Sequence, residues 1–123
     1  MNIDLTPNSS NQMFTNVSDL VSISNPYFLW RFYNEESKSN SLLYITNQTP
    51  LNDRFDRFDI TLPTDVDLNE GKYRFYIYEN NNNVDTDYEN MTLLREGALT
   101  VTTTFNSDTY YEPTGADKYY EPE

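Results

Sequence analysis

Hydrophobic and polar residues alternate with a period of two along most of the chain, and no stretch sustains a period of 3.6. The clearest example is residues 27–33, where Phe28, Trp30 and Phe32 fall on one face. Alternation of this kind is typical of half-buried β-strands. The expected strands are residues 13–17, 20–23, 27–33, 42–46, 55–62, 73–78 and a last one through Leu99, Val101 and Thr103.

Turn-forming residues separate these segments at intervals of roughly 8–12 residues, a spacing typical of β-sandwiches. We therefore predict an all-β protein with an immunoglobulin-like β-sandwich of about seven strands. The sandwich is expected to cover residues 13–105. A polar N-terminal arm over residues 1–12 and a Tyr-rich, acidic C-terminal arm over residues 106–123 are expected to flank it.

The segment 68–76, Leu-Asn-Glu-Gly-Lys-Tyr-Arg-Phe-Tyr, resembles the tyrosine corner of immunoglobulin-like sandwiches. There a Tyr near the start of a strand hydrogen-bonds back to the preceding corner, and a Gly permits the turn. Leu68, Gly71 and Tyr73 are the matching residues, and Trp30 fits the buried Trp of the same architecture. These four residues predict the fold rather than a function.

The tail repeats itself, because Tyr-Tyr-Glu-Pro at residues 110–113 recurs at residues 119–122. One interpretation is a solvated, disordered terminus, which is common at chain ends. The other is an arm that docks on a neighbouring subunit, since Tyr is enriched at protein interfaces. The candidate contact residues are Tyr110, Tyr111, Tyr119 and Tyr120.

Residues 53–59 repeat a three-residue unit of Asp, Arg and Phe. On a strand, Arg54 and Asp56 would share a face, and Arg57 and Asp59 would do so in the same way. The simpler interpretation is a charged outer face with weak ion pairs. The functional interpretation is that Arg54 and Arg57 contact a partner protein, because Arg is favoured at interfaces.

Three tyrosines, Tyr33, Tyr76 and Tyr78, are expected on the outward faces of their strands. An exposed aromatic face of this kind can stack on sugar rings or pack on a neighbouring protein. Alternatively, the N-terminal arm or the long loop that follows Asn80 covers part of it. The pattern leaves these alternatives open.

The amino-acid composition excludes several classes of function. The 123 residues include 20 Asp and Glu but only 8 Lys and Arg, which gives a net charge of -12, and there is no His or Cys. The usual ligands of zinc, haem and iron–sulfur centres and the His- and Cys-dependent nucleophile systems are therefore missing. We expect no catalytic residue, metal or cofactor, and therefore no enzyme. The acidic charge also argues against binding to nucleic acid or to anionic membranes.

The first residues lack the basic and apolar regions of a signal peptide, so we expect synthesis in the cytoplasm. No apolar run approaches the roughly 18 residues of a membrane helix. The spacing of Asp65, Asp67 and Asn69 begins like a calcium-binding loop. It fails at the later positions, where Glu70 and Tyr76 replace the required Gly and Glu.

The order of these segments over residues 13–101 resembles that of short structural proteins of tailed phages of Bacteroidetes, including the crAss-like phages. The proteins it is similar to are immunoglobulin-like virion proteins, often auxiliary or decoration proteins of the phage head. The residues that carry the resemblance are 24–34, 44–47, 53–60, Leu68, 71–73, 76–79 and 93–101.

The resemblance implies a virion component of the phage head, made in the cytoplasm of the bacterial host. Its expected role is that of an auxiliary capsid protein, which binds the major capsid protein or other virion proteins and stabilises the shell. Head-fibre proteins are further candidate partners. The alternatives are a tail, baseplate or head-fibre-attachment component, or a carbohydrate-binding adhesion module.

Overall fold

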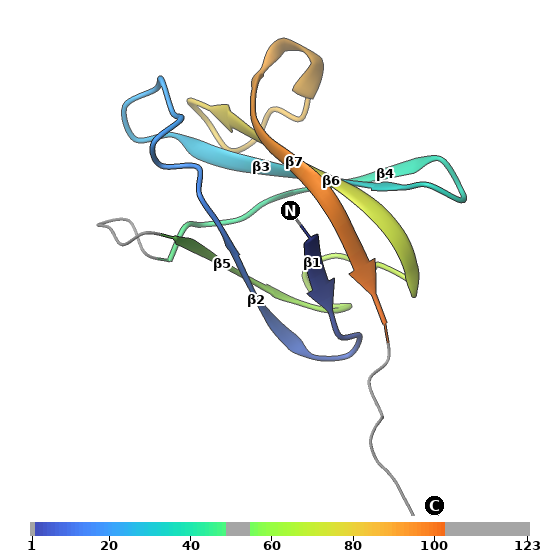
Figure 1. Ribbon diagram of the computed structural model, residues 1–123. Coiled ribbons are helices and arrows are strands. Elements are labelled where there is room, and N and C mark those ends of the chain that lie inside the picture. The colour runs from blue at the N-terminus through green and yellow to red at the C-terminus, as the bar shows by residue number, and fades with distance from the viewer. Residues whose placement is uncertain (1, 49–54, 103–123) are drawn as a thin grey trace, which may run out of the picture.

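A computed structural model describes residues 2–48 and 55–102 of the protein. It consists of two β-sheets that pack face to face (Figure 1). The elements are β1 (Asn2–Leu5), β2 (Ser10–Thr15), β3 (Tyr27–Asn34), β4 (Ser39–Tyr44), β5 (Asp56–Thr61), β6 (Gly71–Asn80), the 3-10 turn η1 (Tyr88–Asn90) and β7 (Thr92–Val101). The predicted all-β sandwich is confirmed. Among the described residues, no helix has the length and hydrophobicity needed to cross a membrane.

The larger sheet has the strand order β1-β7-β6-β3-β4, and the smaller sheet pairs β2 with β5. All pairings are antiparallel except that of β1 with β7, which is parallel and places Asn2 opposite Ala98. The second and fifth strands thus face a sheet built on the third, sixth and seventh. This division of strands is the one found in immunoglobulin-like sandwiches.

The N-terminal arm expected over residues 1–12 is instead part of the sandwich from residue 2 onward. Ile3 and Leu5 alternate into the core and are buried, and β1 pairs with the last strand. Residues 10–12 open β2, where Asn11 lies opposite Ile60. A four-residue strand with two apolar side chains is stable here because a distant strand satisfies its backbone and the core buries those side chains.

Residues 20–23, expected as a strand, lie in the loop between β2 and β3. The backbone N–H groups of Ser22 and Ile23 donate to the side chain of Glu79 rather than to a neighbouring strand. A buried carboxylate therefore takes the place of a β-ladder at these positions.

Aromatic side chains from both sheets meet at the centre of the core. Trp30 is fully buried, and its ring centroid lies 5.1 Å from that of Phe58 in β5 and 5.5 Å from that of Phe75 in β6. Phe28 makes a second edge-to-face contact with Phe58, at 5.5 Å between centroids. The alternation on β3, β5 and β6 thus directs one set of aromatic residues into a single core.

The turn before β6 has the geometry of a tyrosine corner. The hydroxyl of Tyr73 donates to the carbonyl oxygen of Asn69 at 2.9 Å, and Leu68 is buried beside it. Gly71 has a φ of 149°, a backbone conformation that favours glycine. The corner fixes how the chain enters the central strand β6.

Replacing Tyr73 with Phe is expected to lower the free energy of unfolding by about 1 kcal/mol, because the carbonyl of Asn69 loses its donor. Urea unfolding followed by circular dichroism measures the loss. The matched control is Tyr33→Phe on β3, whose hydroxyl has no hydrogen bond within residues 2–48 and 55–102 and should cost close to nothing. Equal losses in the two variants would contradict a structural role for the corner.

Candidate functional site

A buried carboxylate fixes the start of the loop between β2 and β3. Asp56, the first residue of β5, is almost fully buried between the sheets. Its oxygens accept hydrogen bonds from the Val17 N–H, the Ser18 N–H, the Ser18 hydroxyl and Asn47 Nδ2, at 2.8, 2.9, 2.5 and 2.9 Å. One side chain therefore ties this loop to the segment that follows β4.

The placement of Asp56 corrects the outer-face prediction for residues 53–59. Asp56 shares the inward face of β5 with Phe58 and Ile60, whereas Arg57 and Asp59 lie on the outer face. The Asp56 carboxylate can be buried because four hydrogen-bond donors from neighbouring segments replace the water molecules that it loses on burial.

The pKa of Asp56 reflects this balance. Burial on its own raises the pKa of the carboxyl group, and the hydrogen bonds from Ser18, Val17 and Asn47 lower it. The hydrogen bonds prevail, so the pKa lies below its ordinary value of 3.8. The group is therefore charged at neutral pH and holds its donors as a carboxylate.

A second carboxylate and an arginine hold the rest of the same loop. Glu79, in β6, is buried and accepts from the N–H and hydroxyl groups of Ser22 at 2.9 and 2.6 Å and from the N–H of Ile23 at 3.1 Å. Arg95 of β7 donates from Nε to the carbonyl of Asn16 at 2.8 Å. Side chains from three strands thus fix the loop of residues 16–26 at its start and in its middle.

This loop borders a pocket at one end of the sandwich. Figure 1 shows the β2–β3 loop, in blue, and the β6–β7 loop, in yellow and orange, at the same end of the molecule. The pocket has a volume of about 610 Å³, within the range of small-molecule sites. Its lining comes from both loops, from the first residues of β3 and from the segment after β4: Ser18, Val21, Asn25, Pro26, Tyr27, Phe28, Tyr44, Ile45, Thr46, Asn47 and Asn83.

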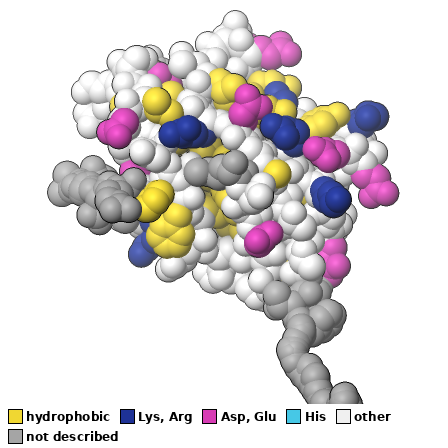
Figure 2. Space-filling view, in the orientation of Figure 1, with side chains coloured by type: hydrophobic (Ala, Val, Ile, Leu, Met, Phe, Trp, Pro, Cys, Tyr) yellow, Lys and Arg dark blue, Asp and Glu magenta, His cyan; other side chains and the backbone are white. Residues whose placement is uncertain are grey.

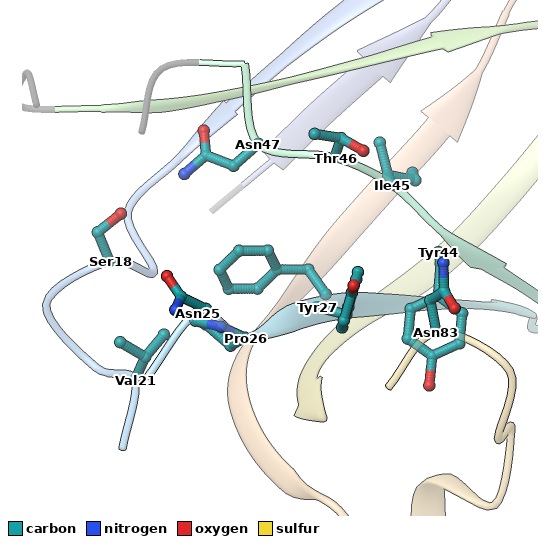
Figure 3. Close-up of a pocket in the computed structure, with 11 residues that line it drawn as sticks. Ser18, Val21, Asn25, Pro26, Tyr27, Tyr44, Ile45, Thr46, Asn47 and Asn83 are labelled. Atoms are coloured by element: carbon teal, nitrogen blue, oxygen red, sulfur yellow. The ribbon is translucent and has the colours of Figure 1, made fainter. Parts of the chain in front are cut away.

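The pocket has an apolar floor and a polar mouth. Figure 3 shows Val21, Asn25 and Pro26 on one side, with residues 45–47 facing them. Phe28 and Ile45 are buried, and the side chains at the mouth are exposed amides, hydroxyls and an aromatic ring. The residues at the mouth are Ser18, Asn25, Tyr27, Thr46 and Asn83.

The outer face of the large sheet is partly covered, as one of the alternatives above anticipated. The β6–β7 loop folds back so that Tyr88 lies over the sheet, and the guanidinium of Arg31 sits between two rings. Its carbon is 4.1 Å from the centroid of Tyr76 and 4.4 Å from that of Tyr88. Tyr78 is buried beneath Tyr88, and this burial raises the pKa of its hydroxyl. The three outward tyrosines therefore do not form an open aromatic platform.

The outer face of the small sheet exposes two phenylalanines. Phe14 of β2 is 51% exposed and lies opposite Arg57, and Phe55, just before β5, is 52% exposed. We call the outward side chains of Gln12, Phe14, Phe55, Arg57 and Asp59 the β2–β5 face. Figure 2 shows hydrophobic side chains over this sheet.

Of the predicted partner contacts, Arg57 lies on the β2–β5 face. It forms an ion pair with Asp59 at 3.2 Å, and the side chains of both are about one-third exposed. Arg54, Tyr110, Tyr111, Tyr119 and Tyr120 lie outside the described residues. The structure thus places one of the predicted contacts on a surface with exposed apolar neighbours.

Sequence reasoning missed the pocket and the two buried carboxylates. A signal for Asp56 was present, because it is two and four residues before the inward-facing Phe58 and Ile60. The pocket gave no such signal, since its lining comes from segments up to 65 residues apart (Ser18 to Asn83; 83 − 18 = 65). No protein-family model and no curated protein matches the sequence.

Proposed function

We propose that this chain is a non-enzymatic structural protein of a phage particle, an auxiliary capsid protein that binds the major capsid protein and stabilises the shell. The resemblance of residues 13–101 to immunoglobulin-like virion proteins supports this proposal. The absence of His and Cys from the sequence is in keeping with a binding role. The uncharged lining of the pocket also favours binding over acid–base chemistry.

The observation that carries the proposal is the β2–β5 face. Two half-exposed phenylalanines lie close together in a chain of net charge -12, because Phe14 is opposite Arg57 and Phe55 is two residues before it. Diagonal neighbours across an antiparallel pair are within reach of aromatic side chains. Aromatic residues and Arg are enriched at protein interfaces, so this face fits a protein partner.

The backbone of β2 adds a second means of contact. Within the described residues, β2 forms a ladder only with β5. Because Leu62 N–H donates to the carbonyl of Ser9, the alternation of the ladder turns the backbone groups of Gln12 and Phe14 toward the open edge. Such an edge can accept a strand from another protein, and the exposed Phe14 ring would add apolar contact.

In a capsid, a single contact of this kind is repeated many times. Each capsid subunit presents the same surface, so an added contact is repeated by the symmetry of the particle. The acidic remainder of the surface favours basic patches on capsid subunits and discourages particles from associating with one another. In this proposal, the sandwich is a rigid part that bridges neighbouring subunits.

Replacing Phe14 with Ser is expected to lower incorporation into phage heads roughly tenfold or more, since buried interface aromatics dominate binding energies. Particles that lack the chain are mixed with the purified variant, sedimented and assayed for bound protein. The melting temperature of the variant should stay close to that of the wild type, because Phe14 is largely exposed.

Leu93→Ser on β7 is the matched control, because Leu93 is 43% exposed and lies in the other sheet. It should be incorporated like the wild type. If Phe14→Ser is incorporated equally well, the β2–β5 face is not the contact. If the wild-type chain does not bind the particles at all, the capsid role itself is wrong.

A further inference from the structure

We infer that the pocket at the loop end of the sandwich binds a neutral carbohydrate. This site is separate from the β2–β5 face, since none of the five residues of that face lines the pocket. The proposal therefore does not rest on the capsid role.

The lining excludes charged ligands. None of its eleven residues carries a charge at neutral pH, although the chain has a net charge of -12. An anionic ligand would find no cationic side chain in the lining and would meet the repulsion of the whole chain. A cationic ligand would find no carboxylate there, because Asp56 and Glu79 are buried and hydrogen-bonded to the loop.

The remaining lining suits a ligand with both apolar faces and hydroxyl groups. Tyr27 is 46% exposed at the mouth. In Figure 3 it lies between Pro26 and Tyr44. Aromatic rings of this kind can stack on the C–H faces of a pyranose, which are apolar. A purely apolar ligand would leave the side-chain amides of Asn25 and Asn83 unpaired, and that is costly.

The amides at the mouth can bond sugar hydroxyls. Within the described part of the chain, the side chains of Asn25 and Asn83 have no hydrogen-bond partner. An amide both donates and accepts, and so does a sugar hydroxyl. Asn25 adopts a φ of 56°, a left-handed conformation that Asn tolerates better than most residues.

The pocket is organised before any ligand binds. Tyr44 donates from its hydroxyl to the carbonyl of Asp85 and accepts from Asn80 Nδ2 at 3.1 Å, which fixes its ring against the β6–β7 loop. The opposite wall is held by Asp56 and Glu79. A preorganised site loses less conformational entropy on binding than a flexible one.

The test is a titration of the full chain, followed by NMR and calorimetry, with maltohexaose, cellohexaose and mannohexaose as neutral probes. An oligogalacturonate of the same length is the anionic control. We expect at least one neutral probe to bind with a Kd between about 0.1 and 10 mM, with shifts centred on Asn25, Tyr27 and Asn83. The anionic probe should not bind.

Tyr27→Ala should weaken binding roughly tenfold, and Tyr27→Phe should retain it, because the ring rather than the hydroxyl makes the stacking contact. Phe14→Ala, which removes a similarly exposed ring outside the pocket, should leave carbohydrate binding unchanged. The inference is overturned if no neutral probe binds, if the anionic probe binds as tightly, or if Tyr27→Ala binds like the wild type. Particle incorporation by Tyr27→Ala should be normal, so failure here is distinguishable from failure of the capsid role.

Discussion

Replacing Trp30 with alanine is expected to lower the free energy of unfolding by about 4 kcal/mol and the melting temperature by about 20 °C. Trp30 is the largest of the fully buried side chains, and it contacts aromatic residues of both sheets. Its removal leaves a cavity between Phe58 and Phe75 that neither sheet can fill without moving. Urea unfolding followed by far-ultraviolet circular dichroism measures the loss without depending on tryptophan fluorescence.

Trp30→Phe is the matched variant, because it keeps an aromatic ring in the core. It should cost distinctly less than the alanine variant. The indole Nε1 has no hydrogen-bond partner within the described residues, so the smaller ring also removes a buried, unpaired donor. A loss below about 1.5 kcal/mol for Trp30→Ala would show that the two sheets do not depend on this side chain.

Replacing Asp56 with Asn is expected to lower the free energy of unfolding by about 3 kcal/mol near neutral pH. The substitution keeps the shape of the side chain but removes its charge. It also replaces one carboxylate oxygen with an NH2 group, which cannot accept the hydrogen bonds that Val17, Ser18 and Asn47 donate to Asp56. We expect the loop of residues 16–26 to lose protection from hydrogen exchange first, because Asp56 fixes its start.

The effect of Asp56→Asn should depend on pH in a defined direction. The folded-state pKa of Asp56 is lower than its ordinary value of 3.8, so the unfolded chain binds the proton more readily. The stabilisation is therefore fully present above about pH 5 and is lost as the pH falls through the folded-state pKa. The difference in unfolding free energy between wild type and Asp56→Asn should be constant above that pH and shrink below it.

Asp59→Asn is the control for this experiment. Asp59 is an acid on the same strand, but it lies on the outer face in a partly exposed ion pair with Arg57. Removing the charge of Asp59 should lower the free energy of unfolding by about 0.5 kcal/mol or less. The account of the β2–β3 loop fails if the two variants lose equal stability, or if the effect of Asp56→Asn does not change between about pH 3 and pH 7.

Strands with a strong inward alternation were predictable from the sequence. β3 and β6 carry aromatic or branched residues at every second position, and β5 does so at Phe58 and Ile60. These side chains point where the pattern indicates, whereas the inward placement of Asp56 was not predicted. β1 was not predictable in this way. It has only Ile3 and Leu5 as signals, and its partner β7 lies more than ninety residues further along the chain, since Asn2 pairs with Ala98 (98 − 2 = 96). Pairing over such a distance leaves no local trace.

The candidate sites were less predictable than the fold. Val21 and Ile23 alternate with serines as a strand would, yet a carboxylate from β6 takes the backbone donors of Ser22 and Ile23. Only tertiary structure brings Glu79 to that position. The pocket depends in the same way on loops that are distant in sequence and meet at one end of the sandwich, so its uncharged lining emerges only once the strands are paired.

In the proposed function, four parts of the molecule have different physical roles. The aromatic core and the tyrosine corner hold the sandwich together, and the buried carboxylates fix its loop end. In the proposed function, the β2–β5 face offers apolar and backbone contacts to a partner. The charge of -12 then serves to keep the rest of the surface solvated while this face is engaged.

The most direct test of the capsid role is a reconstruction by electron cryomicroscopy of phage particles produced from a genome that encodes this chain. We predict density for the sandwich on the head, repeated with the symmetry of the shell, with Phe14 and the edge of β2 against capsid subunits. Particles without such density, or with the sandwich attached only at the tail, would contradict the proposal.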